Sequence, residues 1–340
     1  MKTVKTILKV LLGIILVLAV VVVIGMFAVP TEMRIERSID VNAPKAMVHR
    51  YVSHLQLMKE WGVWFDMDPD MKNEYADEDG RPGAINTWES SVVGNGSQEI
   101  TLVTADRVET KLRFTGDWES EADAYIQLAE GEAGAVKVSW GMITEIGRPF
   151  NFIMSLAGFE KALTDDYDRG LIKLKDLLEE KVRSKTYNGY VIETVQVPPT
   201  IFLYKRDKVA MDAIQEFFEN NLGALYNQLT KAGASPGAPS GFFFVWDEAN
   251  NITEMAAAIP FSGGRGIKPE QTLMIEGSAL KIDYYGNYGT DQIPAYEAFA
   301  DYIKDWSLEE RELIWEEYVT DPGEEPDTSK WLTRIYYFIK

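Results

Sequence analysis

The stretch LIWEEYVTDP at residues 313–322 places two carboxylates, Glu316 and Glu317, between aromatic side chains. On a β-strand, successive side chains point to opposite faces. Glu316 then shares a face with Tyr318, and Glu317 shares the other face with Trp315. Only one of the two acids can therefore point into a pocket.

A carboxylate that points inward has restricted chemistry. Burying it costs several kcal/mol unless it is protonated or paired with a cation. A cation about 4 Å away gains about 4 kcal/mol at an effective dielectric constant near 20. Aromatic faces add roughly 0.5 to 2 kcal/mol each. Such a pocket suits flat or amphipathic cationic organic molecules, whereas the alternative interpretation makes both acids solvated surface charges.

The remaining polar clusters give weaker signals, and we expect neither a metal nor a cofactor. DMDPDMKNEYAD at residues 66–77 has the aspartate spacing of a calcium loop, but Met71 replaces the required glycine and Asp77 the terminal glutamate. His49 and His54 are five residues apart, so they do not share a helical face as zinc ligands four apart would. The chain has no cysteine, which excludes disulfides and thiolate chemistry.

The first 29 residues predict a transmembrane anchor. Twenty consecutive uncharged residues, from Val10 to Val29, can span a bilayer as a helix. Lys2, Lys5 and Lys9 precede them without an acidic residue, which predicts a cytoplasmic N-terminus. We therefore expect a single-pass protein of the plasma (inner) membrane with its C-terminal domains outside. A cleaved signal peptide is the alternative, but its apolar region is usually only about 7 to 15 residues long.

The part of the chain after the anchor is strongly acidic. The whole chain has 34 basic and 53 acidic residues, and without the three N-terminal lysines the net charge is about −22. Such a surface repels phosphate backbones and anionic headgroups. We therefore expect no nucleic-acid partner, and membrane contact only through the N-terminal helix.

Residues 33–183 have the pattern of an α+β domain. MRIERSIDVNAP indicates a strand that ends at Pro44, and a helical stretch follows. Further strands are predicted from NTWESSVVG, QEITLVTADR, VETKLRFTG, AYIQLAEG and AVKVSWGMITEI. Apolar residues spaced by three and four over 153–182 predict one long amphipathic helix. Some of the many aromatic residues are expected to line a cavity: Trp61, Trp64, Phe65, Trp88, Phe114, Trp118 and Trp140.

Four segments follow one another in this domain: RSIDVNAPKAMVHRYVSHLQLMKEW, RPGAINTWES, VETKLRF and FEKALTDDYDRGLIKLKDLLE. In this order they resemble the START-like, polyketide-cyclase-type helix-grip family, also called SRPBCC. The resemblance implies a curved antiparallel sheet that grips a long C-terminal helix around a cavity for hydrophobic small molecules or lipids. Only some members of the family are enzymes.

The turn-rich SKTYNGY at residues 184–190 is interpreted as a linker to a second domain over residues 191–340. In this domain the order strand, helix, strand, strand occurs twice. The first half contains TIFLYKRDKVAMDAIQEFFENNLGALYNQL and the second ALKIDYYGNYGTDQIPAYEAFADYIKDW. Two such β-α-β-β halves would pack around a pseudo-twofold axis and leave a groove between them.

The second domain contains the spaced motifs AGASPGAPSGFFFVWD, YYGNYG, DW at 305–306, WEEYVTDP and TRIYYFI. In this order they resemble the GyrI-like effector-binding fold, which also occurs as the drug-sensing domain of AraC-type and MerR-type regulators. In that family a Glu-x-Tyr on a strand puts a carboxylate in the floor of the ligand cavity. The matching residues here are Glu316 and Tyr318. The candidate walls are Trp306, Tyr285, Tyr336, Phe244 and Trp246.

These patterns leave three functional hypotheses. The preferred one is a membrane-anchored, non-catalytic protein that captures or senses hydrophobic or cationic ligands, although Arg334 could neutralise Glu316 and remove the preference for cations. Some GyrI-like proteins hydrolyse reactive small molecules, so the second is a hydrolase with Glu316 as its base. The third is a structural or partner-binding envelope protein whose pockets are filled by its own side chains.

Overall fold

The computed structural model describes residues 2–116, 119–288 and 292–340. Trp118 and Gly289, the last residue of YYGNYG, lie outside the described residues. The chain forms two compact units, Met1–Val182 and Arg183–Lys340. Each combines helices with a large antiparallel sheet, which confirms the predicted α+β class.

Unit 1 begins with helix α1 (Lys2–Ala28). Its segment Lys9–Ala28 is 20 residues long and apolar enough to cross a membrane, and almost none of it is buried in the protein. The helix meets the requirements for a membrane span by its length and its composition.

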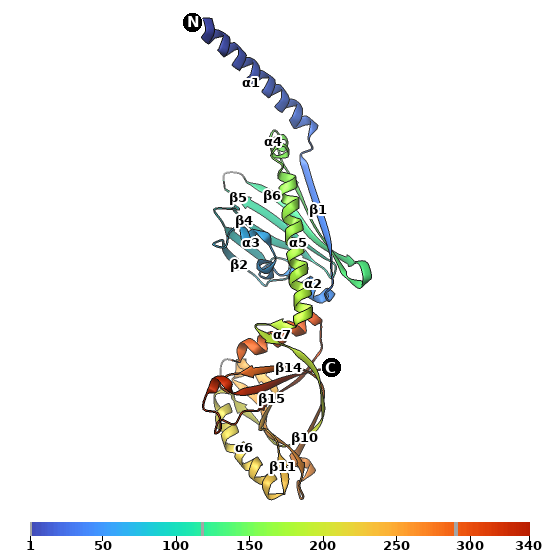
Figure 1. Ribbon diagram of the computed structural model, residues 1–340, viewed down its shortest axis with the longest axis vertical. Helices are drawn as coiled ribbons and strands as arrows, with labels where there is room; N and C mark the ends of the chain where they lie inside the picture. Colours follow the sequence, from blue (N-terminus) through green and yellow to red (C-terminus); the bar gives the residue numbers. More distant parts are fainter. Residues whose placement is uncertain (1, 117–118, 289–291) are drawn as a thin grey trace. The chain divides into compact units, whose positions relative to one another are not determined.

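A seven-stranded antiparallel sheet follows, in the order β1-β7-β6-β5-β4-β3-β2. Figure 1 shows helix α5 crossing one face of this sheet. The strands are β1 (Glu32–Val41), β2 (Lys72–Ala76), β3 (Ile85–Glu89), β4 (Asn95–Val103), β5 (Arg107–Thr115), β6 (Ser120–Glu130) and β7 (Val136–Glu145). Two short helices, α2 (Lys45–Ser53) and α3 (Val63–Met67), lie between β1 and β2 in the chain. This is the arrangement expected of a helix-grip domain.

The predicted single helix over residues 153–182 is two helices. Helix α4 (Phe150–Leu156) ends before Gly158, whose φ of +72° is a left-handed conformation that favours glycine. Helix α5 (Phe159–Ser184) then packs Tyr167 and three leucines of its apolar stripe against the sheet. The prediction was wrong here because a periodicity of three and four does not detect one left-handed residue.

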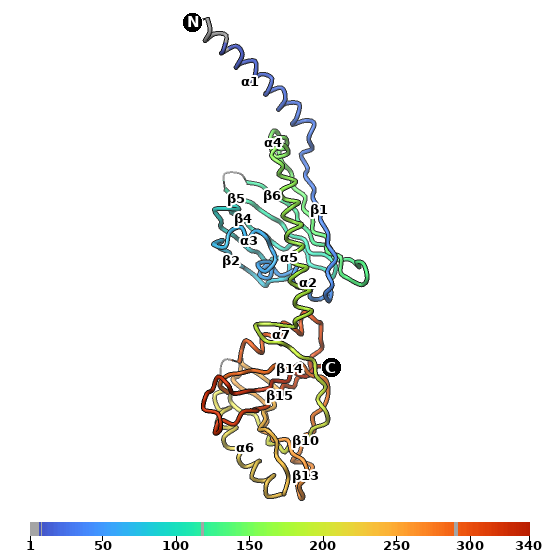
Figure 2. The backbone as a smooth tube through the Cα atoms, viewed as in Figure 1, coloured from blue at the N-terminus to red at the C-terminus, as the bar shows by residue number. Residues whose placement is uncertain are grey.

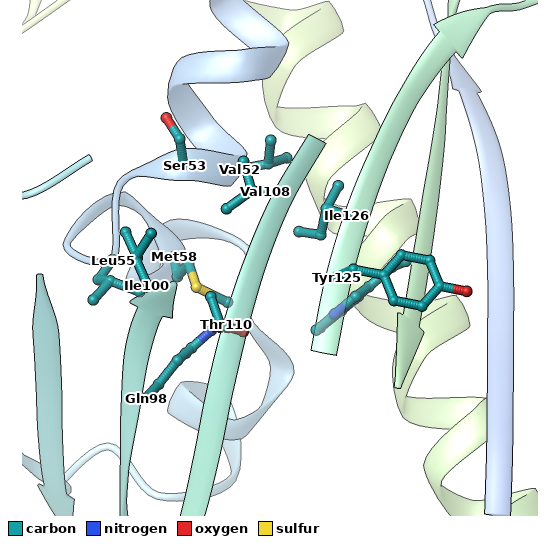
Figure 3. A pocket seen from close by; sticks show the side chains of 11 residues that line it. Val52, Ser53, Leu55, Met58, Gln98, Ile100, Val108, Thr110, Tyr125 and Ile126 are labelled. Atoms are coloured by element: carbon teal, nitrogen blue, oxygen red, sulfur yellow. Dashed lines mark hydrogen bonds between the residues drawn. The ribbon is translucent and has the colours of Figure 1, made fainter. Parts of the chain in front are cut away.

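The interior of unit 1 is filled by its own aromatic residues. Trp140 of β7 stacks on Tyr167 of α5 with 4.0 Å between ring centroids, and Trp61 and Trp64 pack edge-on against Trp140. A cavity of about 10 Å³ lies in this unit. Its lining is mainly apolar and comes from α2, the turn after it and β4 to β7, including the predicted Trp140, with Ser53, Gln98 and Thr110 as polar members (Figure 3). This space is about that of one water molecule, far below that of an organic ligand.

Unit 2 repeats the predicted order β-α-β-β. The first half is β10 (Glu193–Ala210), α6 (Ile214–Lys231), β12 (Ser240–Asp247) and β13 (Ile252–Gly263). The second half is β14 (Thr272–Tyr285), α7 (Ile293–Trp306), β15 (Glu310–Tyr318) and β16 (Leu332–Ile339). A short strand β11 (Ala234–Pro236) pairs with the end of β13. The path of the chain through both halves can be followed in Figure 2.

The sheet of unit 2 closes into a barrel because β10 pairs with two strands. Its first half pairs with β14 and its second half with β13, at the other side of the order β10-β14-β16-β15-β12-β13. Side chains therefore point either into the barrel or outward to the helices. Phe202, Phe242 and Trp315 belong to the interior cluster. The outer face carries one cluster under α6 and another under α7.

The segment predicted as a linker, 184–190, contains a small hairpin of β8 (Thr186–Tyr187) and β9 (Tyr190–Val191). Its turn is formed by Asn188 and Gly189, both with positive φ, as expected for a two-residue hairpin turn. Tyr187 is buried and packs edge-on against Tyr302 of α7. This segment is therefore a packed part of unit 2.

Candidate functional site

Glu316 lies on the outer face of the barrel, between the areas covered by the two helices. It pairs across strands with Gly241 of β12 and with Ile335 of β16. Gly241 in turn pairs with Ala257, which packs under α6, while Ile335 packs under α7. The carboxylate therefore lies where the two β-α-β-β halves meet.

Two tyrosines hold the Glu316 carboxylate. Tyr318, two residues later on the same strand face, donates its hydroxyl to Oε2 at 2.8 Å, and Tyr296 of α7 donates to Oε1. Glu316 is only 4% exposed. Burial raises the pKa of its carboxyl, and the two hydrogen bonds partly oppose this effect. Burial also raises the pKa values of Tyr296 and Tyr318, so both remain neutral donors.

Further aromatic rings surround these tyrosines. Phe218 of α6 packs edge-on against Tyr318, with 5.6 Å between ring centroids. The ring centroids of Tyr288 and Tyr318 are 5.1 Å apart. Gly241 makes this packing possible, since a Cβ there would lie 2.7 Å from Phe218 and 2.9 Å from the Tyr318 hydroxyl. Both halves of the duplication thus contribute rings around one carboxylate.

Glu316 has no cationic partner among the residues that the structure describes, and the hypothesis that Arg334 neutralises it is wrong. Arg334 pairs across strands with Glu317 and lies on the interior side of the barrel. Its guanidinium is 3.4 Å from the Glu317 carboxylate and 3.8 Å from that of Asp283. The two adjacent acids thus differ: Glu317 is in an ion pair, and Glu316 is bonded only by neutral hydroxyls.

One more polar group lies beside the site without a partner. Thr333 of β16 is the cross-strand neighbour of Tyr318 and is fully buried. Its hydroxyl has no hydrogen-bond partner in the described part of the chain. A buried hydroxyl without a hydrogen bond lowers the stability of the fold, and a ligand with a polar group that bonds to this hydroxyl would remove that cost.

The five predicted wall residues lie away from Glu316. Phe244 and Tyr336 belong to the barrel interior, where Tyr336 stacks on Trp315 at 4.2 Å. Tyr285 is 61% exposed at the end of β14 and alternates away from Tyr284, which packs under α7. These three residues alternate to the opposite side of the sheet from Glu316.

The other two predicted wall residues, Trp246 and Trp306, lie farther along strand β12 and helix α7. Trp246 is 54% exposed near the end of β12 and donates to the Glu248 carboxylate. Trp306 is on α7, as is Tyr296, but ten residues later, which is about 15 Å along a helix. It stacks on Tyr302 there. The structure thus brings together Glu316 and Tyr318 from the predicted set of seven.

The sequence reasoning missed Tyr296, Phe218 and Gly241. Tyr296 borders the buried stripe of α7, next to Ala295 and near Phe299, so the helical pattern contained a usable signal. Phe218 and Gly241 were not recognisable, because their proximity to Glu316 depends on strand register and on the position of α6.

The acidic segment 66–77, predicted as a solvated loop, spans the end of α3, a turn and strand β2, and separate interactions hold it. Asp66 forms an ion pair with Lys173 of α5, and Asp68 accepts the Ser90 hydroxyl at 2.5 Å. Asp68 also accepts from the backbone of Asp70. These carboxylates are engaged with different partners rather than with one another.

Comparison with known proteins identifies the first unit. Residues 32–179 match the family described as polyketide cyclase / dehydrase and lipid transport. The predicted SRPBCC-type domain is thereby confirmed. The match covers less than half of the chain, and the GyrI-like character of unit 2 stays a prediction. No curated protein matches the chain.

Several solved structures are similar in part. The chain of an EcmrR–DNA complex is 14% identical, with 56% of this chain and 72% of that one covered and a TM-score of 0.40. The C-terminal domain of EcmrR is 15% identical, with 44% and 98% covered and a TM-score of 0.39. A point mutant of norcoclaurine synthase from Thalictrum flavum is 16% identical, with 44% and 96% covered and a TM-score of 0.35. At these values no activity follows from the likeness.

Proposed function

We propose that this protein is a membrane-anchored small-molecule-binding protein that captures or senses amphipathic organic cations at Glu316. The buried carboxylate carries the proposal, because it is bonded by two neutral hydroxyls and has no cationic partner among the described residues. α1 is the anchor in this proposal. The GyrI-like resemblance of unit 2 supports the same type of ligand.

The energetics favour a cation over a neutral ligand. At an effective dielectric constant near 20, a cation about 4 Å from Glu316 gains about 4 kcal/mol, and the rings of Tyr296, Tyr318, Phe218 and Tyr288 add roughly 0.5 to 2 kcal/mol each where their faces are reached. The ligand would replace one or both tyrosine hydrogen bonds. The raised pKa means that binding a cation expels a proton in the pH range where the free carboxyl is protonated.

Unit 1 is a weaker candidate for holding this ligand. Its match to a family described as polyketide cyclase / dehydrase and lipid transport supports small-molecule binding. Both its cavity of about 10 Å³ and the packing around Glu316, which is 4% exposed, would have to open for an organic ligand. We assign the primary ligand to unit 2 because Glu316 supplies the charge that a cation requires.

The test is a titration of the full chain in nanodiscs with a panel of lipophilic cations and neutral molecules of the same shape. We expect saturable binding of cations and an affinity loss of roughly tenfold or more in Glu316→Gln, corresponding to at least about 1.4 kcal/mol. The matched control is Glu317→Gln, which changes the adjacent acid on the other face. Equal cation affinity in Glu316→Gln and the wild type would refute the site.

The same titration separates the other hypotheses. Conversion of a ligand into a product, lost in Glu316→Gln, would identify a hydrolase instead of a binding protein. The arrangement of a carboxyl with raised pKa between two tyrosines is compatible with a general base. No response to any compound would favour a structural or partner-binding role.

A further inference from the structure

Helix α4 and the residue after its break expose an apolar surface. Phe150, Ile153, Met154 and Phe159 are exposed, and Leu156 is 72% exposed. The segment from 150 to 159 contains no charged residue, although a quarter of the chain is charged. Leu156 and Phe159 belong to the apolar spacing predicted over 153–182, yet they are 72% and 38% exposed, so together with their neighbours they form an exposed apolar patch of the kind that marks an interaction site.

This surface is fixed to the end of α1. The buried Asn151 of α4 donates its amide to the carbonyl oxygens of Met26 at 2.9 Å and Val29 at 2.8 Å. Arg148, just before α4, donates to the Met26 carbonyl at 2.9 Å. These bonds satisfy carbonyl groups that the end of a helix leaves without intrahelical donors.

Side chains also lock the two helices together. The ring of Phe152 lies directly against Gly25 of α1, where a Cβ would be 2.5 Å from it. The Arg148 guanidinium lies 5.0 Å from the ring centroid of Phe27. Helix α4 is thus held at the level of residues 25–29, where the apolar span ends.

We infer that α4 and Phe159, here called the α4 patch, insert into the lipid interface of the membrane that α1 spans. This inference rests on the proposed anchoring by α1. If residues 9–28 cross the bilayer, residues 25–29 lie at its surface, and the α4 patch attached there meets the boundary between headgroups and acyl chains. The patch extends the apolar surface of the span and has no charge to keep it in water.

The inserted patch would be a second contact with the membrane. A single helix leaves an attached domain free to tilt at the bilayer surface. A second contact, fixed to the helix end by Asn151 and Arg148, orients the sheet of unit 1 on the membrane.

The chain has no cysteine, so single introduced cysteines can report depth. The full chain is labelled with an environment-sensitive fluorophore at Leu156→Cys and placed in liposomes of phosphatidylcholine and phosphatidylglycerol. The lipids carry a spin-label quencher either near the headgroup or deep in the acyl chain. Leu102→Cys is the matched control, because Leu102 is also an exposed leucine of this unit (37%) and lies near the end of β4 that is at the other end of the sheet from Glu32 and α1. Leu16→Cys, in the middle of α1, reports on the span itself.

We expect a blue-shifted emission at position 156 and several-fold stronger quenching by the headgroup label than at position 102. Position 16 should be quenched best by the deep label. Quenching at 156 equal to that at 102, with position 16 still quenched, would overturn the inference and leave the anchor intact. Loss of quenching at 16 would instead refute the anchor and the inference with it. A blue shift at 156 that depends on protein density and not on lipid quencher would indicate a second protein copy on the patch, which also contradicts our inference.

Discussion

At the scale of single residues, strand alternation alone distinguishes the two adjacent acids. Glu316 and Tyr318 share a face and are hydrogen-bonded, whereas Glu317 pairs with Arg334 on the other. Alternation is a local property and can be read from any strand. The identity of the neighbours across the strands is not local, which is why Tyr296 and Gly241 were missed.

The raised pKa of Glu316 predicts a specific pH dependence of stability. The folded state keeps the Glu316 proton to a higher pH than the unfolded chain, in which the carboxyl titrates near 4.5. The bound proton therefore stabilises the folded state fully below pH 4.5. This stabilisation is lost as the pH rises through the pKa of Glu316 in the folded state. Glu316→Gln removes the titration, so its free energy of unfolding should rise relative to the wild type as the pH increases, by about 1.4 kcal/mol per unit of pKa shift.

Urea denaturation of both proteins between pH 4 and pH 8 measures this difference, with Glu317→Gln as the control that should not show the same trend. A stability difference that stays constant over this range would mean that Glu316 titrates normally. Tyr296 and Tyr318 do not contribute in this window, since burial raises their pKa values well above 10.

At the scale of elements, most strands and both repeats of β-α-β-β were predictable, because each has its own periodicity and turn signals. The break at Gly158 was not, since the apolar spacing runs through it from Leu156 to Phe159. No sequence pattern indicates the close contact that Gly170 of α5 makes with the sheet. Gly170 of α5 faces Trp140, and a Cβ there would lie 2.9 Å from the indole ring.

This contact predicts opposite effects for two helical glycines. Gly170→Ala should destabilise the protein by about 1 to 3 kcal/mol, because Trp140 is stacked on Tyr167 and cannot move away. Gly223→Ala on α6 is the matched control, since nothing lies within 4 Å of its Cβ position. There the higher helix propensity of alanine should stabilise by about 0.5 to 1 kcal/mol. Urea denaturation of the full chain in detergent compares the two, and a stabilised Gly170→Ala would contradict the packing described.

At the scale of the whole molecule, the closure of the unit 2 sheet explains the misplaced wall residues. A closed barrel has an interior that requires large side chains and an outer face that requires them under the helices. Phe244 and Tyr336 fill the interior, so these two residues do not share the face of Glu316 although they lie on the strands next to it. Closure depends on the pairing of β10 with β13, between strands far apart in the chain, and no local pattern reveals it.

The orientation of the chain in the membrane that we propose for α1 is also a property of the whole molecule. Lys2, Lys5 and Lys9 precede the apolar span, so the positive-inside tendency predicts that both units lie outside the cytoplasm. A membrane-impermeant maleimide added to intact spheroplasts should then label Val92→Cys, while Thr3→Cys should react only after lysis. The cysteine-free chain gives the background for both. Labelling of position 3 with protection of position 92 would reverse the topology, and the ligand of Glu316 would then be a cytoplasmic molecule. Labelling of neither before lysis would mean that the chain does not reach the outer side.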